Sequence, residues 1–107
     1  MERIIAGQFH TKNEADIVAA SIAQFVDTGD YCVSSNAAPA GAAEQARPDG
    51  FMLSVRIGSP KSERVVLAAL RKGRAADIEQ AEGTWRDGAW ADYNPLAAPQ
   101  LVKGAIN

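Results

Sequence analysis

The sequence of 107 residues has one cysteine, one histidine, no cluster of basic residues and no long apolar run. One cysteine excludes an internal disulfide, so packing must hold the fold, as is usual in a reducing compartment. A net charge of -2 without grouped cations argues against nucleic acid, because phosphate binding needs clustered lysine and arginine. No stretch reaches the roughly 18 apolar residues of a membrane helix, and the N-terminus lacks a signal-peptide core. We therefore expect a cytoplasmic protein that binds neither nucleic acid nor, in this form, a membrane.

Motifs that carry familiar chemistry are also missing. The sequence has no glycine-rich phosphate loop, no Cys-x-x-Cys pair and no Ser-His-Asp set that one histidine completes convincingly. His10 lacks a cysteine or histidine partner at ligand spacing, so we interpret it as a solvated loop residue rather than a base or metal ligand. Cys32 lies in an apolar strand and is interpreted as a small buried hydrophobe rather than a nucleophile. We predict no catalytic residue, no metal and no cofactor.

Two strands are predicted in the first half of the chain. Arg3–Phe9 is apolar on both faces, which indicates a central strand, and Gly7 leaves a place where another part of the chain can approach closely. Tyr31–Ser34 is short and ends in polar residues, as an edge strand does.

A helix is predicted between these strands. Thr11 and Glu14 form a capping box, in which each side chain satisfies the backbone N–H of the other residue. Apolar residues then follow at helical spacing and predict a stripe that faces a sheet: Ala15, Val18, Ile22 and Phe25. The segment Asp27–Gly29 is expected to end the helix.

The stretch from Ser35 to Gly50 shows neither the apolar spacing of a helix nor the alternation of a strand. It consists almost wholly of Ala, Gly, Pro, Ser, Asn and charged residues, so we predict a flexible surface loop. A connection of this length is unusual inside a compact domain and commonly marks function, disorder or an insertion point.

The second half repeats the pattern of the first. Phe51–Ile57 alternates apolar and other residues, which predicts a strand with one apolar face. Ser59 and Pro60 begin a helix that ends at Gly73 after two cations. A fourth strand is predicted over Ala76–Glu82.

The two helices correspond position by position. The pairs share one sequence offset and are Thr11 with Ser59, Ala15 with Glu63, Val18 with Val66, and Ile22 with Leu70. Two such βαβ units, residues 3–34 and 51–82, interleave into a ferredoxin-like α+β fold with a four-stranded antiparallel sheet and two helices on one face. The chain is then a single domain over residues 1–107, with the loop 35–50 between the units and a hairpin and arm over 83–107.

Acidic side chains gather near the fourth strand. By alternation Asp77 and Glu79 share one face, where two carboxylates could hold a cation or act as an acid and base pair. We favour the simpler interpretation, an edge strand that its charges keep soluble.

An aromatic hairpin is predicted after this strand. Asp87-Gly88 between β-favouring residues suits a type I′ turn, which places Trp85 opposite Trp90. These tryptophans, Arg86 and Tyr93 are our candidate interaction residues. The hairpin is expected to extend from the fourth strand, at an edge of the sheet, and the proline-containing segment 94–99 to form an extended arm that can reach a neighbour.

Both ends of the chain resemble a group of uncharacterised proteobacterial proteins related to the heat-induced general stress protein domain. The resemblance lies in Arg3–Phe9 and Ala76–Leu96 and is most specific in Trp85-Arg86-Asp87-Gly88-Ala89-Trp90. Members commonly carry a long Gly/Ala-rich, membrane-compatible zipper between the halves, where this sequence has only the loop 35–50. The resemblance implies a stress-linked association and no established catalytic residues.

Two functions from different classes follow from these observations. The first is a non-catalytic association domain that forms a homodimer through sheet edges, the hairpin or the arm. The second is a small ligand sensor or an enzyme like the dimeric α/β-barrel monooxygenases, with the sheet face opposite the helices as a pocket floor and His10 near its mouth. A pocket containing His10 and a buried carboxylate would favour the second function.

Overall fold

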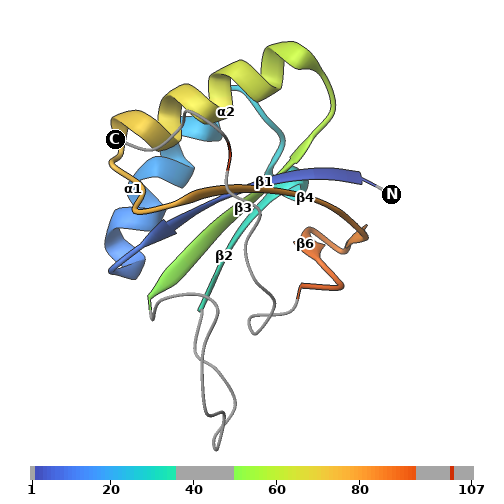
Figure 1. Cartoon of the computed structure of the whole chain (residues 1–107). Helices are drawn as coiled ribbons and strands as arrows, with labels where there is room; N and C mark the ends of the chain where they lie inside the picture. Colours follow the sequence, from blue (N-terminus) through green and yellow to red (C-terminus); the bar gives the residue numbers. More distant parts are fainter. Residues whose placement is uncertain (1, 36–49, 94–101, 103–107) are drawn as a thin grey trace, which may run out of the picture.

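A computed structural model describes residues 2–35, 50–93 and 102 of the chain (Figure 1). The fold is α+β, with a four-stranded antiparallel sheet and a separate two-stranded one. The elements are β1 (Glu2–Phe9), α1 (Lys12–Ile22), the 3-10 helix η1 (Thr28–Asp30), β2 (Tyr31–Ser35), β3 (Phe51–Ile57), α2 (Pro60–Lys72), β4 (Ile78–Gly83), β5 (Trp85–Arg86) and β6 (Ala89–Trp90).

The strand order of the larger sheet is β2-β3-β1-β4. The two most apolar strands, β1 and β3, therefore lie in the centre as predicted, and β2 and β4 are the edges. Figure 1 shows α1 and α2 on the same side of this sheet. The arrangement is compatible with the predicted ferredoxin-like fold.

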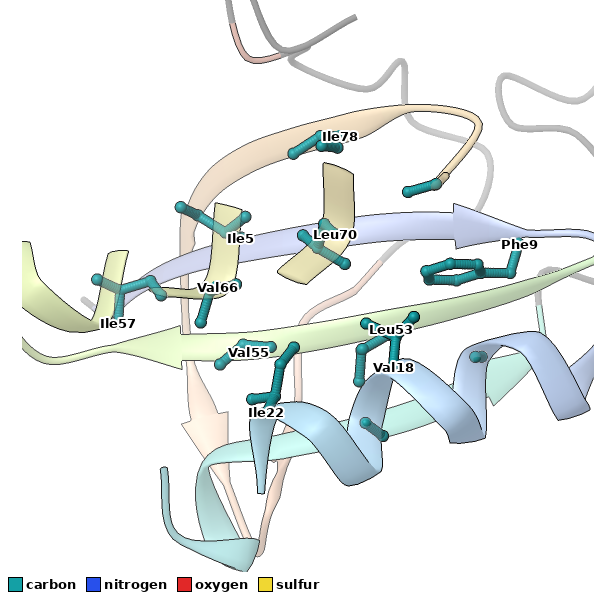
Figure 2. Packing of buried hydrophobic residues seen from close by; sticks show 13 residues of the cluster. Ile5, Phe9, Val18, Ile22, Leu53, Val55, Ile57, Val66, Leu70 and Ile78 are labelled. Carbon is teal, nitrogen blue, oxygen red and sulfur yellow. The ribbon is translucent and has the colours of Figure 1, made fainter. Parts of the chain in front are cut away.

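The hydrophobic core lies between the two helices and the sheet. Figure 2 shows Leu53 and Val55 of β3 facing the helices. The buried stripes of the helices agree with the predicted ones except at Phe25, which is exposed. The helix residues in this cluster are Ala15, Val18, Ala19, Ile22, Val66 and Leu70. Gly7 of β1 is the predicted point of close approach, since a Cβ placed there would lie 2.6 Å from Leu70 Cδ2.

Both helix starts are capped as expected. The Thr11 hydroxyl accepts a hydrogen bond from the Glu14 N–H at 3.1 Å, and the Glu14 carboxylate accepts one from the Thr11 N–H at 3.2 Å. In α2 the side chains of Ser59 and Ser62 make the same reciprocal pair, with Pro60 at the first helical position. Local sequence thus determines where each helix begins.

The predicted end of α1 is wrong. The helix ends at Ile22, and η1 follows before β2. Phe25 therefore falls outside the stripe and is 64% exposed, while Val26 packs against the core in its place. The reason is a tighter turn at Ile22, where the Gln24 N–H donates to the Ser21 carbonyl at 3.4 Å and the Phe25 N–H to the Ile22 carbonyl at 2.8 Å, each three residues back instead of four.

The fourth strand begins two residues later than predicted, at Ile78. Opposite Gln8 of β1, the chain places two residues instead of one, because the Gln8 N–H donates to Asp77 O and the Ala76 N–H donates to Gln8 O. This is a bulge, which shifts the register before regular pairing starts. Asp77 consequently lies outside β4 and does not share its regular alternation with Glu79.

Two predicted segments lie largely outside the described residues. These are the loop 35–50, apart from its end residues Ser35 and Gly50, and the arm 94–99. Beyond the arm, the Val102 N–H donates to the Ile78 carbonyl at 2.8 Å, and the Val102 side chain packs against the core. The chain after the arm is therefore attached to its own β4 at this point.

Candidate functional site

The sheet has a second face, opposite the helices, that is buried rather than solvated. Alternation along β1, β3 and β4 directs a set of side chains to this face, each no more than 2% exposed: Ile4, Ala6, Gln8, Met52, Ser54 and Glu79. We refer to this set as the second face. The predicted apolar face of β3 packs against the helices, and Met52 and Ser54 on its other face are buried as well, because other parts of the chain cover that side.

Polar groups form a row across the middle of the second face. Ala6 lies opposite Ser54 of β3 and Glu79 of β4, and Ser54 lies opposite Cys32 of β2. The Cys32 thiol and the Ser54 hydroxyl are 3.1 Å apart, within hydrogen-bonding distance. The row thus runs from a thiol and hydroxyl pair at one edge to a carboxyl group at the other.

Glu79 departs most from its predicted place. A carboxylate that keeps an edge strand soluble must face water, whereas Glu79 is 1% exposed and lies under other parts of the chain. The favoured interpretation of this residue is therefore wrong. Burial of a carboxyl group is costly unless it is hydrogen-bonded, so its place on the second face needs polar surroundings.

The hairpin itself forms as predicted. Asp87 and Gly88 have φ angles of 54° and 79°, as both central positions of a type I′ turn require. Trp85 lies opposite Trp90 in the register, and the Trp90 ring lies 5.1 Å from that of Tyr93. All three aromatic side chains are half-buried, and Arg86 is exposed.

The hairpin follows the edge strand β4, as predicted, but it adds no strand to the larger sheet. Strands β5 and β6 form a sheet of their own, which Figure 1 shows on the side of the larger sheet away from the helices. Its tip lies by the opposite edge: Trp85 Nε1 donates to the Gly29 carbonyl at 2.7 Å, and a Cβ on Gly88 would lie 3.9 Å from the same oxygen. Gly83 permits this path, since a Cβ there would be only 2.5 Å from Trp90 Nε1.

Asp92 closes the base of the hairpin. Its carboxylate accepts the Thr84 N–H at 3.0 Å, and the Ala91 N–H donates to the Thr84 carbonyl at 2.7 Å. The hydrogen bond from the Thr84 backbone, followed by one from the Trp90 side chain, holds the pKa of Asp92 below its ordinary value. The charged form of Asp92 is therefore the form that fits the hairpin.

We expect the Asp92→Asn variant to be less stable than the wild type near neutral pH, and the difference to disappear only once the pH falls below the depressed folded-state pKa of Asp92. Because the folded-state pKa is depressed, the contribution of Asp92 is fully present above its unfolded value of about 3.9 and is lost as the pH falls through the folded value. Urea unfolding at pH 6, 4 and 3 measures the difference. Asp87→Asn, at the turn of the same hairpin and outside this hydrogen bond, is the control. A difference between wild type and Asp92→Asn that stays constant with pH would contradict this role.

An ion-pair network next to the hairpin tip was not predicted. Arg56 of β3 donates to Asp30 at 2.9 Å and to Glu2 at 3.3 Å, so it links η1 to β1. The hydrogen bonds to Asp30 and then to Glu2 raise the pKa of Arg56 further, so its charge persists. These residues are too far apart in the sequence for any local pattern to reveal the network.

The two residues considered for catalysis do not meet. His10 is exposed at the end of β1, in agreement with its interpretation as a solvated residue. Cys32 is half-buried on β2, so its interpretation as a buried hydrophobe holds only in part, since its thiol has a polar partner in Ser54. Among the described residues, no three His, Cys, Asp or Glu side chains are grouped as a metal site requires.

Comparison of the chain with protein-family models, curated proteins and solved structures finds no match. Within residues 2–35 and 50–93, none of the helices has the length and apolarity needed to cross a membrane.

Proposed function

We propose that this chain is a non-catalytic, ferredoxin-like domain that acts by association and forms a homodimer through its hairpin. The contact surface consists of Trp85, Arg86, Trp90 and Tyr93, which we call the hairpin surface. One observation carries the proposal: the hairpin is held at its tip and at its base, while Arg86 stays exposed and the three aromatic side chains keep part of their surface in solvent.

The composition of the hairpin surface supports this role. Tryptophan, tyrosine and arginine supply most of the residues that dominate binding energy at protein interfaces. A surface that is already ordered loses less conformational entropy when a partner binds. The bonds from Trp85 to Gly29 and from Thr84 to Asp92 supply that order before any partner arrives.

The charges of the turn suit a second copy of the same chain. Arg86 and Asp87 are adjacent and both are exposed. In a dimer with two-fold symmetry the same patch meets itself, so each Arg86 can pair with an acidic side chain of the other turn. A turn that carries both signs is complementary to its own copy.

The resemblance of both ends of the chain to stress-related proteins supports a stress-linked role for this association. Cytoplasmic localisation stays a prediction. The stress-linked role and the cytoplasmic localisation are both inferred from the sequence.

A second candidate function, a small ligand sensor or an enzyme of the dimeric α/β-barrel type, is supported by Glu79. Its carboxyl group is buried on the second face, where such proteins would bind their ligand. His10, the other residue of that hypothesis, is exposed at the end of β1. Small amines, which a buried carboxylate would bind, test this function by amide chemical shift changes at Ser54 and Glu79.

We expect Arg86→Glu to weaken dimerisation by at least about tenfold, because it removes a central cation and places like charges opposite each other. Sedimentation at high micromolar concentration measures the change. Arg64→Glu is the matched control, since Arg64 is exposed on α2, across the sheet from the hairpin. A wild-type protein that stays monomeric, or equal weakening by both variants, would rule out the hairpin surface as the dimer contact.

A further inference from the structure

The outward face of α2 carries cations and no carboxylate. Val66 and Leu70 are the buried positions of this helix, and the residues half a turn away from them are exposed. Glu63, the one carboxylate of α2, lies at its side and pairs with Arg3 of β1 at 2.7 Å. We call the exposed cations of α2 and of the turn after it the cationic stripe: Lys61, Arg64, Arg71, Lys72 and Arg74.

The cationic stripe has no partner within the described part of the chain. None of its five side chains forms an ion pair with any residue in 2–35 or 50–93. They are five of the eleven lysines and arginines of a chain whose net charge is -2. The helical period gathers cations that the sequence spreads over 61–74, so an acidic protein presents a cationic surface that its net charge does not reveal.

The stability of α2 explains only part of the stripe. Arg71 and Lys72 lie in the last turn, where cations interact favourably with the helix dipole. Lys61 lies in the first turn, where a cation opposes the dipole, and Arg64 follows three residues later, where side chains are neighbours on the helix surface. The charges of Lys61 and Arg64 therefore do nothing for α2 itself and are available to a partner outside the domain.

The same side of the domain exposes two large apolar side chains. Ile17 on α1 is 63% exposed, and Phe25, shortly after α1, is 64% exposed. Figure 1 shows α1 and α2 together on one side of the larger sheet, and the two helices are in contact. Phe25 and Ser62 line one hollow, which places Phe25 next to the first turn of α2, where Lys61 lies. The helix side thus joins the cationic stripe to exposed apolar side chains.

We infer that the helix side of the domain docks on an anionic lipid surface, with the cationic stripe on the headgroups and Ile17 and Phe25 at the boundary of the acyl chains. Lysine and arginine near such a surface are attracted to it, and apolar side chains beside them enter the headgroup region. A nucleic acid backbone would also attract the stripe, but it offers no apolar place for Ile17, which favours lipid.

Docking of this kind needs no helix that crosses the membrane. The expectation that this form binds no membrane rests on the lack of a long apolar run, which bears on spanning and not on attachment at the surface. The inference is also independent of the proposed homodimer, because the hairpin lies on the other side of the larger sheet (Figure 1).

Cosedimentation of the full chain with vesicles tests the charges. We expect binding to vesicles that contain phosphatidylserine, none to pure phosphatidylcholine, and a loss of binding as the salt concentration rises. Arg64→Gln/Arg71→Gln should weaken binding about 30-fold, because each cation near such a surface contributes about a factor of five. Arg64→Lys/Arg71→Lys is the matched control, since it changes the same exposed side chains, keeps both charges and should bind like the wild type.

Phe25→Ser tests whether the helix side touches the lipid. It leaves the net charge unchanged and removes an exposed ring, so we expect binding to weaken at least about fivefold while the fold is retained. Phe25→Leu keeps an apolar side chain at this position and should bind nearly as well as the wild type.

Three results would overturn the inference. The first is equal binding to both kinds of vesicle, or equal weakening by the glutamine and lysine variants, because the charges of the stripe would then not matter. The second is stripe-dependent binding of polyuridylate without binding to vesicles, which would assign the stripe to nucleic acid. The third is unchanged vesicle binding by Phe25→Ser, which would show that the helix side does not enter the lipid.

Discussion

Replacement of Leu70 by alanine is expected to destabilise the domain by about 2–5 kcal/mol. Leu70 is 0% exposed in α2 and packs above Gly7 of β1, the place where that strand carries no side chain (Figure 2). A truncated side chain leaves a cavity there, because the glycine below has no atoms to fill it. Strand β1 is hydrogen-bonded on both sides and so cannot move to close the gap.

Leu67→Ala is the matched control for this prediction. Leu67 lies on the same helix and is only half-buried at the border of the core. Leu67→Ala removes the same atoms, but water can enter the vacated space. We therefore expect its loss of unfolding free energy to be less than half that of Leu70→Ala. Urea unfolding of both variants gives the two free energies. Equal losses would mean that the contact with Gly7 is not what makes Leu70 important.

Gly50→Ala should destabilise the domain by about 2–4 kcal/mol, because two effects combine. Gly50 has a φ angle of 135°, a conformation that residues with a Cβ rarely adopt. The added Cβ would also lie against the carbonyl oxygen of Phe9, far inside van der Waals distance. The atom in the way belongs to the backbone of a central strand, so it cannot rotate aside as a side chain can.

Gly58→Ala tests whether the effect belongs to the position or to any glycine beside β3. Gly58 follows β3 directly, is exposed, and has no atom within 4 Å of a Cβ placed there. Alanine at such a site is expected to be neutral or to stabilise by about 0.4–1 kcal/mol, through the lower entropy of the unfolded chain. Chemical denaturation of both variants gives the two free energies of unfolding to compare. A large loss from Gly58→Ala would remove the explanation given for Gly50.

The helix starts, the buried stripes and the central strands could all be predicted from sequence. A capping box depends on residues three apart, and the stripe of Val18 and Ile22 depends on the period of a helix, so both are encoded locally. The type I′ turn at Asp87 and Gly88 is likewise encoded by neighbouring residues. These features need no knowledge of the rest of the chain.

The path of the hairpin could not be predicted in this way. Its local form is encoded by the turn, but its place depends on Trp85 reaching Gly29, a residue 56 positions earlier in the chain. A strong hairpin signal does not say against which part of the sheet the hairpin lies. For the same reason the sequence does not reveal that Glu79 is buried, because alternation assigns a residue to a face and does not say what covers that face.

The sequence by itself therefore determined the elements of this protein and the duplicated arrangement that orders them. The tertiary structure decided where α1 ends, which faces of the sheet are buried and which groups meet on the second face. The physical reason is the range of the interactions. Caps, turns and periodic stripes act over a few residues, whereas the bonds from Arg56 to Asp30 and Glu2, and from Trp85 to Gly29, exist only once distant segments have packed together.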